Sequence, residues 1–271
     1  MTFHGIRFTA LSLSLIKVIA RHSQRSKTFS RPSTDSDTLV GKAVGFVKLT
    51  LVFVEAALEL VPRECWNHRA VISDAERRRK RPGQLLLDRS YHHAAMKSLV
   101  DAHKRGRPDI VHFCLLMSLG SILSKKGLLD VYVHTRENKV IWVNPETRLP
   151  RVYERFKGLI EALYEQRVIE SDGKKLLELR DATLTELLFA LRPDQVILMS
   201  EKGNKMTMKE LGTLLASYER PAVLIGAFPR GELEEQTVKA ANMTVCIYEE
   251  PLEAWTVTSH VICSLEHVLG Y

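Results

Sequence analysis

The sequence predicts an α/β fold in which helices cover a mostly parallel sheet. Three apolar runs, QVILMS, AVLIGAF and MTVCIY, alternate with the helical patterns TMKELGTLLASY, GELEEQTVKAA and EAWTVTSHVICSLEHVLG, as βαβ units do. A fourth run, KLTLVFVE, starts at residue 48 and is β-branched and apolar enough to be a buried strand of the same sheet. Because the candidate strands lie at both ends of this region, we expect one domain over residues 47–271.

Between the first strand and the βαβ units, the spacing of apolar residues predicts further elements. Helical patterns cover Glu64–Arg79, the run YHHAAMKSLVDAHKRG that closes on Gly106, and the largely buried run IVHFCLLMSLGSIL. The runs LLDVYVHT and KVIWVN, separated by RENK, indicate a β-hairpin. The helical runs RVYERFKGLIEALYEQ and TLTELLFAL follow. We interpret the hairpin and the longer helix as a segment inserted into the α/β domain.

The longer helix is predicted to be amphipathic. Its expected apolar face holds Val152, Phe156, Leu159 and Leu163. Glu161 and Glu165, four residues apart, are expected on the solvated face.

The first 46 residues differ in composition from the rest. They carry seven Lys and Arg against two Asp, a net charge of +5, which leaves only +2 of the overall +7 for residues 47–271. This acid-poor, Ser- and Arg-rich composition fits a transit peptide, the short run LSLSLIKVIA leaves a secretory signal open, and translation from a misassigned start is a third interpretation. We expect residues 1–46 to be a disordered, dispensable extension.

Composition also argues against several classes of protein. No apolar run approaches the length that spans a bilayer. The four cysteines show no CxxC spacing, which argues against a zinc ribbon or disulfide framework and fits a reducing compartment such as the cytoplasm. The histidines His92, His93, His103 and His112 have no Cys or carboxylate that completes a ligand pattern, so we expect no metal.

Three strand-to-helix junctions are candidates for a ligand site. GAFPRG, from Gly226 to Gly231, lets the backbone approach a ligand before a helix start, although it is neither a GxGxxG nor a P-loop motif. IYEEPLEAW, from Ile247, places Pro251 at the next helix entrance. LMSEKGN, from Leu198, is a third. Junctions at the carboxyl ends of neighbouring parallel strands form the usual ligand crevice of an open α/β sheet.

NPETRLPRVYERF concentrates three arginines, Arg148, Arg151 and Arg155, around the start of a predicted helix. Cations at a helix N-terminus are unfavourable in isolation, by a few tenths to about 1 kcal/mol each. A phosphate in front of them reverses the sign, because helix dipole and guanidinium then attract the same anion. The run is either an ordinary solvated face or an RNA-binding surface, and the placement of the cations favours RNA.

GRPDIVH places Arg107 and Asp109 on either side of a proline before a predicted helix. Asp109 is either the helix N-cap, a carboxylate that orients Arg107 toward phosphate or a base, or a proton acceptor. Pairing with Arg107 would lower the basicity of the carboxylate.

Six motifs resemble, in order, those of the small-subunit ribosomal RNA pseudouridine N1-methyltransferases: LLLDRSYHHAAMKSL, GRPDIVHFCLL, VYVHT, NPETRLPRVYERFKGLIEAL, GAFPRG and IYEEPLEA. These enzymes belong to the SPOUT, or trefoil-knotted, superfamily. The resemblance spans about residues 48–271 and is to archaeal members. It implies a SPOUT-type knotted α/β fold, a homodimer, and S-adenosylmethionine held in the knot as methyl donor.

The resemblance also assigns roles to single residues. Arg107, Arg148, Arg151 and Arg155 correspond to arginines that contact rRNA, and Asp109 to the carboxylate that stabilises Arg107. The cofactor-binding positions are Leu198, Gly226, Gly231, Glu232, Leu233, Ile247, Tyr248, Glu249, Glu250, Pro251 and Leu252. The pair Glu249–Glu250 is more acidic than in many relatives.

The implied reaction moves a methyl group from the sulfonium of S-adenosylmethionine to ring nitrogen 1 of one pseudouridine in small-subunit rRNA, as a step of ribosome biogenesis. That nitrogen carries a proton in pseudouridine and is bonded to the sugar in uridine. Two alternatives stay open: a non-catalytic rRNA-binding assembly factor, and a knotted methyltransferase that acts on another RNA site. The partners implied are small-subunit rRNA, a second copy of the chain and ribosomal assembly proteins.

Overall fold

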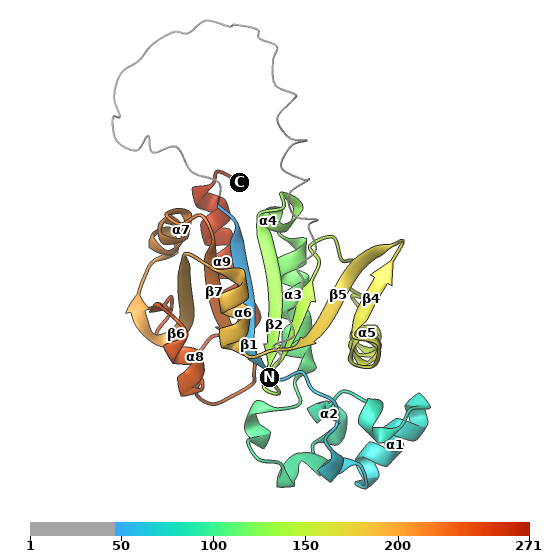
Figure 1. Ribbon diagram of the computed structural model, residues 1–271. Coiled ribbons are helices and arrows are strands. Elements are labelled where there is room, and N and C mark those ends of the chain that lie inside the picture. Colours follow the sequence, from blue (N-terminus) through green and yellow to red (C-terminus); the bar gives the residue numbers. More distant parts are fainter. Residues whose placement is uncertain (1–46) are drawn as a thin grey trace, which may run out of the picture. The chain divides into compact units, whose positions relative to one another are not determined.

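The computed structural model describes residues 47–271, and the predicted extension 1–46 lies outside the described residues. The strands are β1 (Leu49–Ala56), β2 (Leu129–Thr135), β3 (Lys139–Val143), β4 (Val168–Ser171), β5 (Lys174–Asp181), β6 (Gln195–Lys205), β7 (Pro221–Gly226) and β8 (Met243–Cys246). They form one sheet in the order β4-β5-β3-β2-β1-β7-β6-β8 (Figure 1). The five neighbouring strands β2, β1, β7, β6 and β8 are parallel to one another, whereas the pairs β2–β3, β3–β5 and β5–β4 are antiparallel. The predicted α/β class with a mostly parallel sheet is confirmed.

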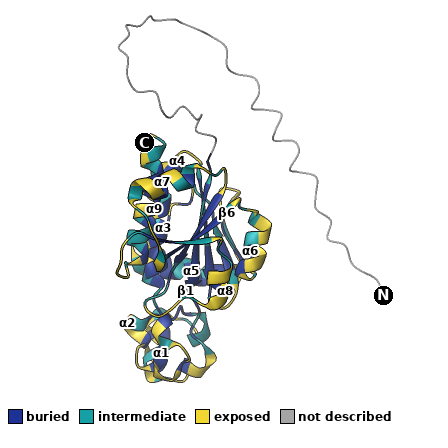
Figure 2. Ribbon diagram, turned by 90° about the vertical axis from the view of Figure 1, so that its left-hand side faces the viewer, coloured by how far each residue is buried: buried dark blue, intermediate teal, exposed yellow. Residues whose placement is uncertain are grey.

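Helices cover both faces of this sheet. They are α1 (Arg69–Arg78), α2 (Arg89–His92), α3 (Pro108–Gly120), α4 (Ile122–Lys125), α5 (Tyr153–Gln166), α6 (Leu184–Leu191), α7 (Met208–Ala216), α8 (Glu235–Lys239) and α9 (Ala254–Val268). Buried side chains of α3, α5, α7 and α9 share one core cluster with the sheet, and those of α6 share a second cluster on the opposite face. Figure 2 shows the strands buried between these two layers.

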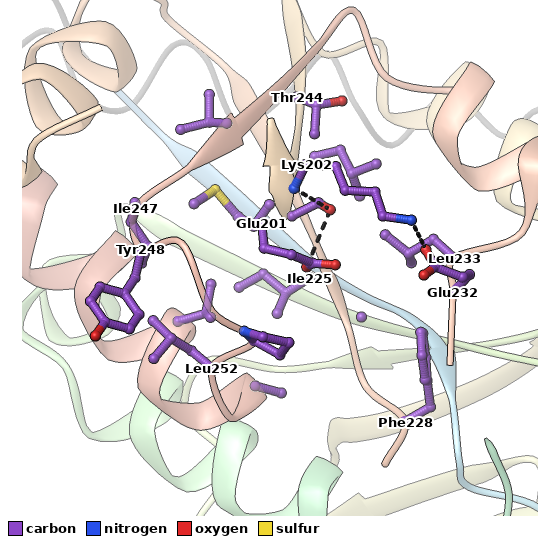
Figure 3. Close-up of a pocket in the computed structure, with 18 of the residues that line it drawn as sticks. Glu201, Lys202, Ile225, Phe228, Glu232, Leu233, Thr244, Ile247, Tyr248 and Leu252 are labelled. Carbon is purple, nitrogen blue, oxygen red and sulfur yellow. Dashed lines mark hydrogen bonds and ion pairs between the residues drawn. The ribbon is translucent and has the colours of Figure 1, made fainter. Parts of the chain in front are cut away.

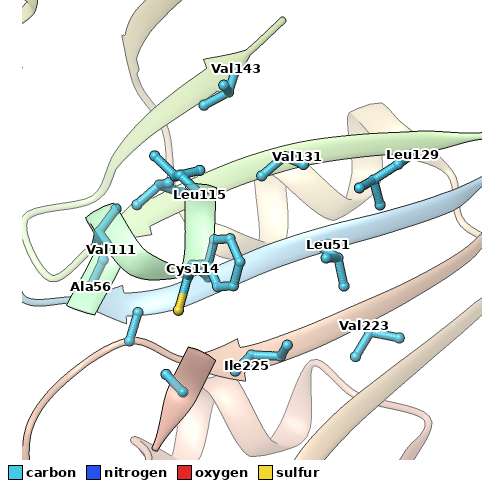
Figure 4. Close-up of a cluster of buried hydrophobic side chains, with 14 of the residues drawn as sticks. Leu51, Ala56, Val111, Cys114, Leu115, Leu129, Val131, Val143, Val223 and Ile225 are labelled. Carbon is cyan, nitrogen blue, oxygen red and sulfur yellow. The ribbon is translucent and has the colours of Figure 1, made fainter. Parts of the chain in front are cut away.

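The position of β1 at the centre of the sheet explains why its sequence is apolar without alternation. Leu51 and Phe53 point into the core cluster under α3, while Val52 and Val54 belong to the cluster under α6. A strand of a parallel sheet that is covered on both faces reads as a continuous hydrophobic run. In Figure 4, Leu51 lies among side chains of β2, β7 and α3, such as Val131, Val223 and Cys114.

Three details differ from the sequence-based expectations. The run from Tyr91 to Gly106 is not one helix: after α2 it breaks into 3-10 turns at Ala95–Ser98 and Ala102–Lys104. Left-handed backbone at Asp101, with φ 52°, and at Gly106, with φ 70°, interrupts helical continuity. β4 and β5 are not predicted from the sequence, because these strands at the sheet edge are half-exposed and rich in Lys and Glu, which hides their alternation. The predicted hairpin, β2 and β3, lies within the main sheet.

β6 is longer than predicted and runs through the junction LMSEKGN to Lys205. It pairs with β8 twice, first at Ile197–Met199 and again at Asn204 and Lys205, with a shift in register between. At Gly203 a Cβ would lie 2.6 Å from backbone atoms of Thr244 and Val245. Only a residue without a side chain lets these two backbones touch. The trefoil knot itself stays a prediction.

Residues 61–106 form a small lobe, called here the α1–α2 lobe, beyond the end of β1 (Figure 1). It has its own core cluster, which contains Val61, Cys65, Val71, Leu85 and Met96. Short helices and turns suffice here because their apolar side chains converge on this cluster.

Glu161 on α5 joins the lobe to the sheet through buried ion pairs. Arg78 donates two hydrogen bonds to its carboxylate at 2.6 and 2.7 Å, Lys80 donates one at 2.6 Å, and the Leu86 N–H donates another at 2.9 Å. Glu161 is 4% exposed, so the expected solvated position is wrong. Its cationic partners lie about eighty residues earlier in the chain, where helical spacing on α5 cannot show them.

A second buried pair joins the lobe to α5 at Asp88. Its carboxylate accepts hydrogen bonds from the Lys157 ammonium at 2.9 Å and the Tyr153 hydroxyl at 3.0 Å, and it also caps α2 through the Ser90 N–H. Burial alone would raise the pKa of Asp88, but the hydrogen bond and charge of Lys157, together with the hydrogen bonds from Ser90 and Tyr153, hold that pKa below its ordinary value. On α5 itself, Phe156 and Leu163 are buried as predicted, whereas Val152 is exposed as the N-cap residue.

We predict opposite effects of the same substitution at two helical glycines. A Cβ at Gly212 of α7 would lie 2.2 Å from the Ser264 carbonyl oxygen of α9, whereas a Cβ at Gly158 of α5 would meet nothing within 4 Å. Gly212→Ala should therefore lower the free energy of unfolding by about 1–3 kcal/mol through overpacking. Gly158→Ala should raise it by about 0.5–1 kcal/mol through helix propensity. Urea unfolding of both variants checks this, and a stabilised Gly212→Ala would contradict the close approach.

Candidate functional site

A pocket of about 710 Å³ opens at the carboxyl ends of β7, β6 and β8. Residues 198–202 of β6, the loop 226–233 after β7 and the loop 247–254 after β8 form most of its wall. The junctions GAFPRG and IYEEPLEAW follow β7 and β8, which are not neighbours as predicted, because β6 lies between them. The volume is that of a pocket for one small organic ligand.

The structure brings nearly all predicted cofactor residues together. Of the eleven, only Glu249 is absent from the pocket wall, and the ten that line it are Leu198, Gly226, Gly231, Glu232, Leu233, Ile247, Tyr248, Glu250, Pro251 and Leu252. Glu249 forms an ion pair with Lys205 instead. Figure 3 shows Phe228 and Tyr248 on opposite sides of the pocket, with Ile225 and Leu252 between them. The floor is therefore apolar and the rim polar.

Several wall residues are not among the predicted ones. Lys202 lines the pocket and pairs with Glu232 across it, and Thr244 and Val257 contribute from β8 and α9. Lys202 and Phe228 lie inside the motifs LMSEKGN and GAFPRG, so those motifs already signal them. Thr244 and Val257 could not be found in this way, because the fold alone brings a strand interior and a helix face to the pocket.

Gly231 is required by the close approach of its backbone to the α1–α2 lobe. Its φ of 110° is left-handed, which favours glycine, and a Cβ there would lie 2.9 Å from His103 Nε2. The motif predicts instead that this glycine serves close approach of a ligand before a helix start. That helix, α8, begins four residues later, at Glu235. By contrast, a Cβ at Gly226 would meet side chains of the pocket, Phe228 at 3.1 Å and Leu233 at 3.5 Å.

A buried ion pair fixes the 226–233 loop against the lobe. Lys104 of the lobe donates a hydrogen bond of 2.9 Å to Glu55 at the end of β1, and its ammonium lies 4.6 Å from the centre of the Phe228 ring. The other carboxylate oxygen of Glu55 accepts the Glu234 N–H at 2.8 Å. Glu55 has a left-handed φ of 51° and is buried. One carboxylate thus ties sheet, lobe and pocket loop together.

Arg107 and Asp109 lie at the start of α3. Arg107 is the N-cap residue of this helix, so the N-cap alternative for Asp109 is wrong. The Arg107 guanidinium donates hydrogen bonds to both carboxylate oxygens of Asp109, each at 2.8 Å. This hydrogen bonding raises the pKa of Arg107, as do the nearby charges of Asp109 and Glu253, against the effect of burial. Glu253 follows the 247–252 wall segment, which puts Arg107 beside the pocket.

Arg148, Arg151 and Arg155 are all exposed and surround the start of α5, which begins at Tyr153. None of them forms an ion pair with any residue between 47 and 271. The loop that carries the first two is held by His112 of α3, whose Nε2–H donates to the Pro150 carbonyl at 2.7 Å. The His112 ring also stacks on Phe156 with centroids 4.3 Å apart. Cations that have no acidic partner are available to an anion.

No group of three or more His, Cys, Asp or Glu side chains among residues 47–271 has the geometry of a metal site. His92 is buried against Asp74, and His112 is occupied by Pro150. No helix in the described part of the chain is long and apolar enough to cross a membrane.

The sequence matches one protein family and is similar to known proteins. Residues 51–266 match the sequence pattern of the EMG1/NEP1 methyltransferase family. The chain is 47% identical over 219 residues to the ribosomal RNA small subunit methyltransferase Nep1 of Pyrococcus furiosus, which covers 81% of this chain and 96% of the relative. Identity to Nep1 of Thermococcus sibiricus is 48% over 218 residues, 80% and 97% of the two chains.

A solved structure is similar as well. The crystal structure of Archaeoglobus fulgidus Nep1 bound to S-adenosylhomocysteine superposes with a TM-score of 0.74 at 43% identity, covering 83% of this chain and 100% of that one.

We predict that the folded domain loses stability as the pH falls below about 6.5, the ordinary pKa of an unfolded histidine. Burial lowers the pKa of His92, His112 and His134. Between each lowered pKa and about 6.5 the unfolded chain binds more protons than the folded one, so acidification favours unfolding. Burial raises the pKa of Glu137, and this single carboxyl group opposes the loss of stability that the three histidines cause. Urea unfolding at about pH 7.5 and 5.5 checks the sign; equal or greater stability at the lower pH would contradict it.

Proposed function

The chain belongs to the EMG1/NEP1 methyltransferase family, and we propose that it methylates ring nitrogen 1 of one pseudouridine in small-subunit rRNA, with S-adenosylmethionine as methyl donor. The observation that carries this proposal is the position of Arg107 between the pocket and the start of α5: Glu253, which follows the pocket wall, and Tyr153, the first residue of α5, both lie near its guanidinium. A cofactor pocket and an anion-binding surface that meet at one edge are what methyl transfer to RNA requires.

The pocket fits the proposed cofactor. Its apolar floor suits an adenine ring, and Gly226 leaves space that a side chain would take from Phe228 and Leu233. The carboxylates of Glu201 and Glu250 line it without an ion-pair partner among residues 47–271, and their negative charge suits a cationic sulfonium. When bound, S-adenosylmethionine supplies an activated methyl group. The related Nep1 from A. fulgidus was solved with S-adenosylhomocysteine, the product that this reaction leaves.

The protein's own part in the reaction is to position the RNA. Arg148, Arg151 and Arg155 bind phosphates around the target loop, where the dipole of α5 adds to their attraction. Arg107, held by Asp109, is oriented beside the pocket and steers the target nucleotide toward it. Alignment of the base nitrogen with the methyl group supplies much of the rate.

In our proposal the proton on ring nitrogen 1 passes to solvent water as the nitrogen takes the methyl group, without a dedicated base. Both carboxylate oxygens of Asp109 already accept hydrogen bonds from Arg107, so its role is to orient that arginine rather than to take the proton. Uridine has no free nitrogen at this position, so the chemistry itself selects pseudouridine. We further propose that the modification serves small-subunit biogenesis in the cytoplasm, which the four free thiols suit.

The decisive experiment uses two synthetic rRNA hairpins that carry pseudouridine or uridine at the same loop position. Each is incubated with the protein and methyl-labelled S-adenosylmethionine, and the label on the RNA is counted. We expect label on the pseudouridine hairpin alone. Tight binding without label on either hairpin would favour the rRNA-binding assembly factor. Label on other fractionated RNA would favour a methyltransferase with a different target.

We predict that two substitutions separate the two halves of the site. Arg151→Ala should weaken binding of the hairpin and reduce the slope of log affinity against log salt by roughly 1, while cofactor affinity is unchanged. Gly226→Val should weaken cofactor binding at least tenfold by filling the pocket, a loss of roughly 1.4 kcal/mol, while RNA affinity is unchanged. Calorimetric titrations with S-adenosylhomocysteine and with RNA measure both. Equal losses of both affinities in one variant would refute the separation.

We also propose that the protein is a homodimer through the outer face of α3. Residues 110–124 contain no charged side chain, yet Phe113 and Met117 are exposed, and the Phe113 ring packs 5.3 Å from Trp255 of α9. A helix that is apolar on all sides is normally covered. Met117→Glu should convert a dimer to a monomer in sedimentation analysis while leaving the circular dichroism unchanged. A wild-type protein that sediments as a monomer would overturn the proposal.

A further inference from the structure

We propose that a basic surface at the end of α1, formed by Arg77, Arg79 and Arg81, binds phosphates of the RNA stem that adjoins the target loop. This inference rests on the proposed function and extends the RNA footprint beyond the arginines of α5. Its partner is the sugar–phosphate backbone of a duplex, recognised by charge and shape rather than by base sequence.

Charge is distributed unevenly in the described chain. The α1–α2 lobe, residues 61–106, carries eleven Lys and Arg against five Asp and Glu, a net charge of +6. Residues 47–271 together carry only +2, so the part outside the lobe is at −4. A small lobe with such an excess on an otherwise acidic domain indicates an anionic partner at that lobe.

Burial removes much of the acid from the lobe surface. Asp74 and Asp88 are 4% and 2% exposed and are occupied by internal partners. Arg78 and Lys80 point inward to Glu161. The alternating neighbours of these two, Arg77, Arg79 and Arg81, are exposed. Arg77 also pairs with Asp74, whereas neither Arg79 nor Arg81 forms an ion pair with any residue from 47 to 271. The run thus splits into cations that hold the fold and cations that face solvent.

The surface is continuous with the start of α5. The Arg77 guanidinium lies 4.5 Å from the centre of the Tyr91 ring, and the Tyr91 hydroxyl donates to Glu154 at 3.2 Å. Glu154 lies between Arg151 and Arg155 in the chain, in the first turn of α5. Lys80 contacts Glu161, which lies seven residues after Glu154 on the same helix. Seven residues span about 10 Å along a helix. An RNA bound at the α5 arginines therefore meets the α1 surface as it continues along the helix.

Arg79 permits a variant that separates charge from stability. It is the residue that ends α1, in a left-handed conformation with φ 53° and ψ 44°. Glycine is the residue most often found in this conformation at a helix end. Arg79→Gly thus removes the cation while relieving the backbone, so the variant should unfold at the same or a higher temperature than the wild type.

The test compares two pseudouridine hairpins with the same loop, one with a short stem and one with a long stem, and the full chain carrying Arg79→Gly and Arg81→Gln. We expect the double variant to bind the short hairpin as the wild type does. For the long hairpin, its slope of log affinity against log salt should be smaller by roughly 2, one for each phosphate contact removed. The matched control is Lys125→Gln with Lys126→Gln, which removes two exposed cations from α4 at the other end of the sheet (Figure 1).

The outcomes are distinct. A double variant that binds the long hairpin with the wild-type slope, or a control that loses as much as the double variant, would overturn this inference. If the wild type methylates both hairpins but gains no affinity from the longer stem, the inference fails while the proposed function stands. If the wild type binds neither hairpin, both fail.

Discussion

Two carboxylates that are buried between the α1–α2 lobe and α5 fix the spacing between the arginines of α1 and those at the start of α5, which we propose to contact RNA. Glu161 accepts from Arg78, Lys80 and a backbone N–H, and Asp88 accepts from Lys157 and Tyr153. Removal of one partner from a buried pair typically costs about 3–5 kcal/mol, because the remaining charge stays desolvated. α5 therefore cannot shift relative to the lobe without exposing a buried charge or leaving it without its ion-pair partner. This rigidity sets the distance between the arginines that precede α5 and those of α1.

A third buried carboxylate, Glu55, performs the same task on the other side of the lobe. It holds Lys104 and the N–H of Glu234, so that the 226–233 loop of the pocket and the segment that leads to Arg107 share one anchor. The lobe is thus fixed to α5 by two carboxylates and to the pocket by one. The pocket and the arginines that we propose to contact RNA owe their common orientation to a part of the chain that supplies none of the residues lining the pocket.

Local patterns in the sequence predict much of this structure, and long-range pairing explains what they miss. The strands β1, β6, β7 and β8 and the helices α3, α5 and α9 follow from runs whose composition suits their burial. Motifs at strand ends bring ten predicted wall residues together, because parallel strands end at the same edge. The burial of Glu161 could not be predicted, since its partners come from another element. The lobe's broken helix could not either, since left-handed residues such as Asp101 leave no periodic trace.

The order of these parts along the chain has a consequence for how the protein matures. Every residue that lines the pocket lies at Leu198 or later in the chain, whereas every arginine predicted to contact RNA lies at Arg155 or earlier. During synthesis the ribosome therefore delivers the lobe and α5 before it delivers β6, β7 and β8, which the single sheet needs before the domain folds as a unit. A chain terminated before β6 would carry every arginine proposed to contact RNA and none of the residues that line the pocket. Cofactor binding is therefore a property of the finished chain alone.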